Sequence, residues 1–238
     1  QIKGKVIVLA ASACSTARIL LNSKEGGLGN GSGVIGRYLH DSTGSSMYGF
    51  LPDLMDRDRY NEDGVGGMHV YSPWWEDNKK LDFPRGYHIE VWGGQSMPKY
   101  GHGFNQAEVQ RALGITPGGY GKKYKEELRR IYGAFVGMSG RGESVAQYDN
   151  YCEIDPNKVD EWGIPVLRFH YKWTDYERRQ ARHMQDTFEE ILTNMGARIL
   201  SGKKTASNDY GLNKLGQIIH EGGTARMGDD PKSSVTNG

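Results

Sequence analysis

The stretch that decides the fold of this chain is a strand followed at once by a helix. Residues 165–196 read PVLRFHYKWTDYERRQARHMQDTFEEILTNMG. In its first part apolar and polar side chains alternate, which predicts a strand with one buried face. A Thr174-x-x-Glu177 capping box then opens a helix that Gly196 ends. The apolar residues of this helix recur at helical spacing and form a predicted core stripe: Met184, Phe188, Ile191, Leu192 and Met195.

Upstream of this unit, short β-prone segments lie between glycines and prolines. In Tyr87–Gly93, for example, Tyr, Ile and Val alternate with His, Glu and Trp, which is the period of a strand. The predicted strands are Ser45–Phe50, Met68–Tyr71, Tyr87–Gly93, Ala134–Met138 and Tyr148–Ile154, the last of them ended by Asp155-Pro156-Asn157. The predicted helices in this part are Phe104–Leu113 and Lys122–Tyr132.

The N-terminal part predicts a buried strand that leads into a helix. Residues 5–11 read KVIVLAA, a continuous apolar run typical of a parallel strand. Small residues follow, and a helix is predicted from about Ser15 to Asn22. A small-residue turn of this kind lets a ligand approach the backbone, and it serves plain close packing equally well. The pattern alone leaves both interpretations open.

Length and charge narrow the classes of function. The 238 residues carry 30 basic and 29 acidic side chains, a net charge of +1, which argues against a general nucleic-acid or membrane surface. No apolar run approaches the ~20 residues of a membrane span. Two cysteines, Cys14 and Cys152, are too few for a disulfide framework and are predicted to be buried thiols.

The chain is expected to be an internal piece of a longer polypeptide. It begins with Gln1 rather than Met and runs directly into an apolar segment. It ends at Gly238 without a closing element. The residues therefore leave the cellular compartment undetermined.

A literal match to the dinucleotide-binding pattern G-x-G-x-x-G occurs at Gly31–Gly36, which reads GSGVIG. That fingerprint needs its glycines in the turn directly after a strand. Here they follow a helix and a glycine-rich loop, and a chance match is easy among 34 glycines. A nucleotide-binding domain would rest on this match alone, so we interpret it as unrelated to pyrophosphate binding.

His220 is the strongest catalytic candidate, and no metal site is predicted. No two of the seven histidines have the H-x-x-x-H spacing, and His88 with Glu90 on one strand face makes too few ligands for zinc. His220 ends an apolar segment and precedes two glycines, which would let a flat ligand approach the backbone. A histidine there can accept a proton at neutral pH, and backbone groups can equally satisfy it.

Residues 220–235 read HEGGTARMGDDPKSSV and resemble the C-terminal motif of the glucose-methanol-choline (GMC) family of flavin oxidoreductases. That motif runs H-x-x-G-T, commonly followed by R-M-G and by D-P-x-x-S-V. The matching residues are His220, Gly223, Thr224, Arg226, Met227, Gly228, Asp230, Pro231, Ser234 and Val235.

Three further blocks resemble the same family in the same order. VIVLAASACSTARILLNS at residues 6–23 is similar to its second signature, although Ala17 stands where proline is usual. GLGNGSGVIGRYLHD at residues 27–41 is similar to G-x-V-G-R-x-L-x-D-H, with Ser42 in place of the histidine. DEWGIP at residues 160–165 resembles a D-x-W-G-I-P stretch before the last substrate-domain strand. Within the family, the sequence most resembles bacterial sugar-oxidising members, namely relatives of pyranose oxidase and of gluconate or glycoside dehydrogenases.

The resemblance implies an α+β fold in which α/β pieces of a FAD domain accompany a substrate domain with a mostly antiparallel sheet and flanking helices. Residues 1–42 would be the C-terminal piece of the FAD-binding domain. Residues 43–204 would form the substrate-binding domain. Residues 205–238 would return to the FAD domain and carry the histidine motif.

The resemblance also implies the reaction: flavin-dependent oxidation of a sugar, glycoside or polyol hydroxyl to a carbonyl. Hydride would pass to N5 of the cofactor FAD, and the hydroxyl proton would pass to His220. The residues assigned to cofactor binding are Ala11, Ser12, Gly223 and Thr224. A candidate substrate wall is the strand face with His88, Glu90 and Trp92, which could equally be a solvated face.

The partners implied are a sugar or polyol substrate and, as a further candidate, an electron-acceptor protein or small subunit. A bacterial periplasmic location is compatible with the resemblance. The alternatives are an inactive fragment or a non-catalytic carbohydrate-binding module that stacks Trp74, Trp75 and Trp92 on sugar rings. Such a module has no need of H-x-x-G-T, so the motif favours the enzyme.

Overall fold

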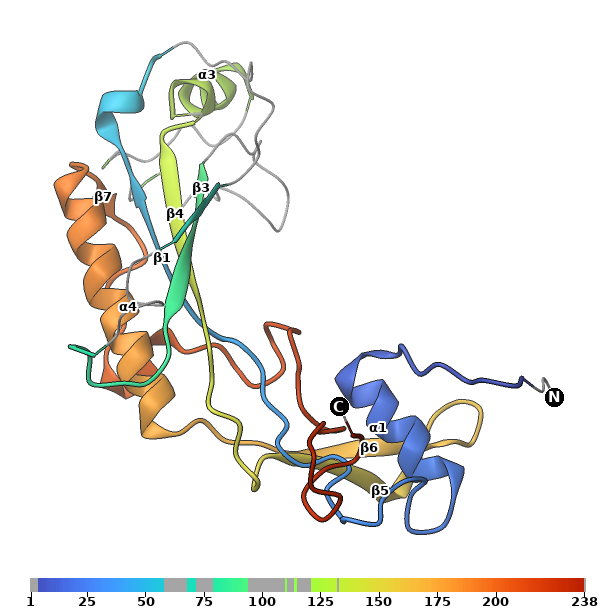
Figure 1. The fold of residues 1–238 in the computed structure, drawn as a ribbon. Coiled ribbons are helices and arrows are strands. Elements are labelled where there is room, and N and C mark those ends of the chain that lie inside the picture. The colour runs from blue at the N-terminus through green and yellow to red at the C-terminus, as the bar shows by residue number, and fades with distance from the viewer. Residues whose placement is uncertain are drawn as a thin grey trace. The chain divides into compact units, whose positions relative to one another are not determined.

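The computed structural model describes residues 4–57, 68–71, 79–93, 110, 114, 121–131 and 133–237. Helices and antiparallel strands are both prominent in them, which confirms the α+β class (Figure 1). The backbone divides into two compact units. The terminal unit comprises Gln1–Ser42, Ser144–Thr174 and Lys214–Gly238, and the sheet unit comprises Thr43–Glu143 and Asp175–Asn213. Residues 144–174 lie in the terminal unit, and the sequence-based domain assignment stays a prediction.

The sheet unit is built on a five-stranded antiparallel sheet with the order β2-β3-β4-β1-β7. Its strands are β1 (Thr43–Phe50), β2 (Met68–Val70), β3 (Tyr87–Gly93), β4 (Phe135–Gly142) and β7 (Arg198–Ile199). The strands predicted at 45–50, 68–71, 87–93 and 134–138 are thereby confirmed within a few residues. Met47 lies opposite Met138 in the register, and Met138 lies opposite Val91. These apolar side chains therefore share one face of the sheet.

The helix α4 (Asp175–Asn194) covers that face (Figure 1). Met184, Phe188 and Leu192 are fully buried against the sheet, which confirms most of the predicted core stripe. Met195 is exposed, because the helix ends one residue before it. The apolar core of this layer consists of Met47, Phe83, Tyr87, Ile89, Val136, Met138, Met184, Phe188 and Leu192.

A second cluster closes one end of the sheet. There α3 (Gly121–Ile131), close to the predicted helix, buries Ile131 beside the rings of Phe50 and Phe135. Short 3-10 helices lie at η1 (Pro52–Leu54) and η3 (Ala206–Gly211). No helix among the described residues is long and apolar enough to cross a bilayer.

The terminal unit packs α1 (Ser12–Ser23) beside a hairpin of β5 (Tyr151–Val159) and β6 (Pro165–His170). The predicted end of the first hairpin strand at 155–157 is wrong. The pairing shifts its register after Ile154, which accommodates the proline, and it continues to Val159. The predicted buried face of β6 is also only partly buried, since Phe169 is 53% exposed. The unit's small core consists of Ala17, Ile35, Leu39 and Cys152.

The predicted parallel strand at residues 5–11 is wrong. The segment forms no ladder, and Val6, Ile7 and Val8 are each about 80% exposed. No described strand pairs with it, and a strand needs a neighbour to satisfy its backbone groups. The helix predicted at 104–113 and the tryptophans at 74 and 75 lie outside the described residues.

Candidate active site

Three segments that are distant in sequence meet at residues 220–224, the motif segment of the terminal unit. The Thr224 hydroxyl donates to the Ala13 carbonyl oxygen at 2.7 Å, and the Thr224 amide donates to the Arg37 carbonyl oxygen at 3.0 Å. The Gly36 amide donates to the Thr224 carbonyl oxygen at 2.7 Å. Because Thr224 is fully buried, these bonds are shielded from water and hold the three segments together.

The two glycines of the motif segment are required by a close backbone approach. Gly222 pairs with His40 in an antiparallel bridge, with amide–carbonyl hydrogen bonds in both directions at 2.8 and 3.2 Å. A side chain on Gly223 would overlap the Tyr38 carbonyl oxygen, and the φ of +82° there suits glycine. The space beside Gly223 is therefore filled by the chain itself, whereas the sequence suggested that it is open to a flat ligand.

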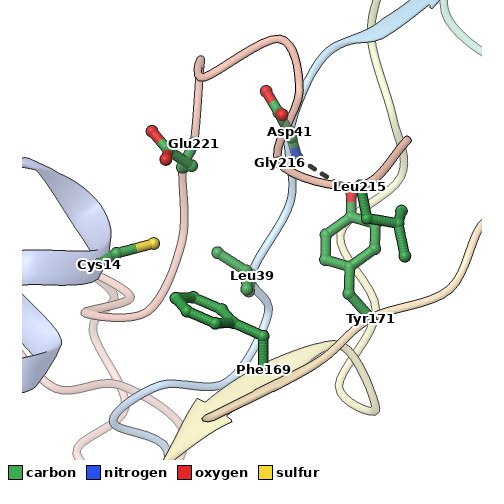
Figure 2. A pocket seen from close by; sticks show the side chains of 8 residues that line it. All are labelled: Cys14, Leu39, Asp41, Phe169, Tyr171, Leu215, Gly216 and Glu221. Carbon is green, nitrogen blue, oxygen red and sulfur yellow. Dashed lines mark hydrogen bonds between the residues drawn. The ribbon is translucent and has the colours of Figure 1, made fainter. Parts of the chain in front are cut away.

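A buried carboxylate that the sequence did not single out holds the backbone of the catalytic candidate. Asp41 is 3% exposed, and its Oδ1 accepts hydrogen bonds from the amides of His220 at 2.9 Å and Ser42 at 2.8 Å. The Asp41 amide donates to the hydroxyl oxygen of Tyr171 at 3.0 Å (Figure 2). Its Oδ2 is buried without a hydrogen-bond partner among the described residues. The signal was in the sequence, because Asp41 is the aspartate of the G-R-x-L-x-D block.

Asp41 lines a pocket of about 350 Å³ within the terminal unit. Figure 2 shows Cys14 projecting from α1 toward Leu39 and Phe169. The full lining is Cys14, Leu39, Asp41, Phe169, Tyr171, Leu215, Gly216 and Glu221. This volume is at the lower end of the range for small-molecule sites, about 300–1,000 Å³. The pocket has apolar walls and two carboxylates, so it favours a ligand with N–H or O–H donors.

Electrostatics keep the thiol in this pocket neutral. Burial, with smaller contributions from Glu221 and Asp41, raises the pKa of Cys14 to about 11. The thiol is therefore protonated at neutral pH and is neither a nucleophile nor a base.

His220 presents its side chain to solvent while its backbone is fixed by Asp41. The preceding Ile219 has a φ of +61°, a left-handed conformation that β-branched residues avoid. Strained backbone of this kind concentrates at functional sites. The geometry leaves the imidazole accessible to a substrate, as the predicted proton acceptor requires.

The predicted cofactor-binding residues fall into two groups that the structure joins. Ser12 begins α1 and Ala11 is its N-cap residue, and the first turn carries no acidic side chain and no side-chain cap. Free amides at a helix N-terminus attract anionic groups. Thr224, which follows Gly223, is linked to this turn because its hydroxyl donates to the Ala13 carbonyl oxygen.

Space for part of FAD, the cofactor that the motif implies, lies in the pocket and not beside Gly223 or Thr224, which the chain itself covers. The Asp41 Oδ2 without a partner can accept from an N–H or O–H group, and the pocket has room for a ring system. The structure gives no support to GSGVIG as the fingerprint that binds the FAD pyrophosphate. Residues 31–36 form turns rather than a strand–turn–helix junction, so GSGVIG lacks the context that holds a pyrophosphate.

The predicted substrate wall lies in the sheet unit, on the face opposite α4. A side chain at Gly140, opposite Ile89, would overlap Met184 of α4, so the alternate residues of β3 point away from that helix. Glu90 Oε1 lies 3.8 Å from His88 Nε2, and both side chains are partly exposed. Trp92 is 44% exposed, and its indole occupies the space that a side chain at position 137 would need.

Comparison with known proteins bears on both units. The family model described as GMC oxidoreductase matches residues 148–238, which include the motif segment. The gluconate 2-dehydrogenase flavoprotein of Pantoea cypripedii is 29% identical over 137 residues, covering 56% of this chain and 22% of the relative. The 2-methyl-1,2-propanediol dehydrogenase of Mycolicibacterium austroafricanum is 26% identical over 245 residues, covering 100% of this chain and 41% of the relative.

The chain thus spans less than half the length of either relative. The match includes His220, Gly223 and Thr224, the residues whose hydrogen bonds and packing define the motif segment. The sequence motif and the comparison agree: residues 148–238 match the GMC oxidoreductase family model, and both relatives are similar to this chain.

Proposed function

We propose that the protein containing this chain is a FAD-dependent oxidoreductase that converts a CH–OH group of a sugar, glycoside or polyol to a carbonyl. The observation that carries the proposal is the family match over residues 148–238, which include His220, whose amide is bound by the pocket residue Asp41. Bound FAD would supply the hydride acceptor.

The role of His220 is to take the hydroxyl proton of the substrate as its C–H bond is broken. The imidazole is exposed, and its backbone is anchored through the amide by Asp41. Because this backbone is held, the segment that carries the imidazole loses little conformational freedom when substrate arrives. A positioned general base of this kind contributes about 10²–10⁴-fold to a rate.

The residues assigned to the cofactor act mainly by holding backbone. The amides at Ala11 and Ser12 would meet an anionic or carbonyl oxygen, a role supported by their position at the uncapped N-terminus of α1. Gly223 and Thr224 fasten the motif segment to this turn and to the 36–40 segment. Asp41 Oδ2 offers an acceptor inside the pocket.

Substrate binding is assigned to the exposed face of β3. His88 and Glu90 offer hydrogen-bonding groups for hydroxyls, and the half-exposed indole of Trp92 offers a flat apolar surface for a sugar ring. One relative is named for gluconate and the other for 2-methyl-1,2-propanediol, both hydroxyl compounds. An electron-acceptor protein or small subunit completes the proposal, supported by the name of the first relative as the flavoprotein of its enzyme.

The test is single-turnover flavin reduction by sugar or polyol in the complete FAD-containing protein. His220→Ala is expected to slow the reduction by ~10²-fold or more, because the proton acceptor is lost. His170→Ala is the matched control, since His170 lies on β6 and pairs with Glu153 on the hairpin. Equal rates for wild type and His220→Ala would refute the role of His220. Sugar binding without flavin, abolished by Trp92→Ala, would instead indicate a carbohydrate-binding module.

A further inference from the structure

The sheet unit brings together three side chains with metal-binding groups. His69 on β2 lies opposite Glu90 on β3 in the antiparallel register, and His88 lies two residues before Glu90 on the same strand. One ligand atom from each of the three residues lies within 4.8 Å of the others. The sequence alone showed only His88 and Glu90 together, because β2 and β3 are joined by a long connection.

The geometry points to a binding site for a divalent transition-metal ion, of the zinc class, formed by His69, His88 and Glu90. Two imidazoles and one carboxylate are a ligand set of known zinc sites, with a further position left open to water or to a substrate hydroxyl. Bond lengths of about 2.0–2.2 Å place neighbouring ligand atoms about 3.4 Å apart in a tetrahedron. The 3.8 Å between His88 Nε2 and Glu90 Oε1 is close to that spacing, so small side-chain rotations suffice.

The surroundings of His88 are a second observation in favour of a ligating role. Its Nε2 is buried and has no hydrogen-bond partner among the described residues. Such a nitrogen is unfavourable when left unpaired. The rings of His69 and His88 lie 5.3 Å apart at 39°, so a small ion can approach both.

Glu90 is oriented by a cation on the next strand. Arg141 Nη2 lies 3.3 Å from Glu90 Oε2, and the same guanidinium donates to Ser139 Oγ and to the Gly140 carbonyl oxygen. The carboxylate therefore presents Oε2 to Arg141 and Oε1 to His88. A ligand held by a neighbour in this way is typical of metal centres, where the outer partners fix the direction of the lone pair.

The experiment uses the metal ion alone as the probe. The sample is the 238-residue chain without a polyhistidine tag, from which a chelator has first removed any bound metal. Titration with Zn²⁺ against a chromophoric chelator is expected to show one tight site per chain. His69→Ala, at an exposed position, and His88→Ala are each expected to weaken it at least tenfold. His170→Ala is the control, because His170 also pairs with a glutamate, Glu153, but has no second histidine beside it in the described residues.

A spectroscopic variant separates ligation from a structural effect. Co²⁺ bound to His69→Cys is expected to show a thiolate-to-metal charge-transfer band in the near ultraviolet that wild type lacks. The proposal is overturned if wild type and His88→Ala bind Zn²⁺ equally, or if His69→Cys shows no such band with Co²⁺ bound. No flavin or sugar is present in either measurement, so the result is independent of the proposed oxidation.

Discussion

At the scale of single residues, the motif segment owes its shape to glycine positions and one aspartate. Gly223 lies where any side chain would overlap the Tyr38 carbonyl oxygen, and Asp41 holds the amide of His220. The family pattern H-x-x-G-T therefore encodes a packing requirement in addition to a chemical one. The histidine can act only if the backbone that carries it stays in place.

Gly223→Ala is expected to lower the free energy of unfolding by about 3 kcal/mol, since it adds a steric overlap to an unfavourable φ. Gly163→Ala is the matched control. Gly163 has a similar φ of +77° and open space around it, so only the conformational cost of about 1 kcal/mol applies. Urea titration followed by circular dichroism measures both. Equal losses would show that the overlap at Tyr38 is relieved.

Cys14 is expected to react slowly with iodoacetamide at pH 8. Its pKa of about 11 leaves roughly 10⁻³ of the thiol ionised at that pH, against about a quarter for an ordinary cysteine, so the rate falls by about two orders of magnitude. The rate should rise about tenfold per pH unit up to pH 10, where an ordinary thiol has already levelled off.

The measurement for Cys14 is peptide mass spectrometry, which separates it from the buried Cys152. Glu221→Gln should speed the reaction at pH 8, because the removed negative charge contributes to the raised pKa. A rate for Cys14 equal to that of a free thiol would mean that the pocket is more open than its lining indicates.

At the scale of elements, the local sequence patterns predict α4 and β3. They do not predict the polar contacts between α4 and β1. Gln180 and Gln185 are buried on the helix face that the apolar stripe shares. Gln185 donates to Ser45 Oγ at 2.8 Å and accepts from the Lys204 amide at 2.9 Å. A buried glutamine is thus the connector between the helix, the sheet and the segment after β7.

Gln185→Leu is expected to lower the free energy of unfolding by about 2–4 kcal/mol, because the Lys204 amide loses its acceptor and Ser45 Oγ, which still donates to the Tyr210 carbonyl oxygen, loses its donor inside the protein. Glu190→Gln is the control on the same helix. It is exposed, so its effect should stay within about 0.5 kcal/mol. Thermal and urea unfolding of both variants give the comparison. A neutral Gln185→Leu would mean that water replaces the lost hydrogen bonds.

At the scale of the whole molecule, two units share one chain that passes between them several times. The terminal unit contains the motif segment, the start of α1 and the pocket, whereas the sheet unit carries the face with His88, Glu90 and Trp92. The proposed catalytic residue therefore belongs to the terminal unit, and the proposed substrate-binding residues belong to the sheet unit.

The 238-residue chain alone is expected to retain no stoichiometric FAD after desalting. Residues 31–36 lack the strand–turn–helix context of a pyrophosphate site, and the pocket of about 350 Å³ offers only a ring-sized space. The absorbance of the desalted chain near 450 nm measures the bound flavin, with the complete protein as control. A yellow, stoichiometric preparation of the chain would contradict the prediction.

The sequence by itself determined the family motif, α4, and the alternation of β3, since each of these is a local pattern with a period or a spacing. It misjudged residues 5–11, whose strand pattern needs a neighbour, and β5, whose ladder continues past a proline. Only the tertiary structure decided that Asp41 holds His220, 179 positions away, and that His69 joins His88 and Glu90. Such contacts join residues that are distant in sequence, and no local sequence pattern predicts which distant residues will meet.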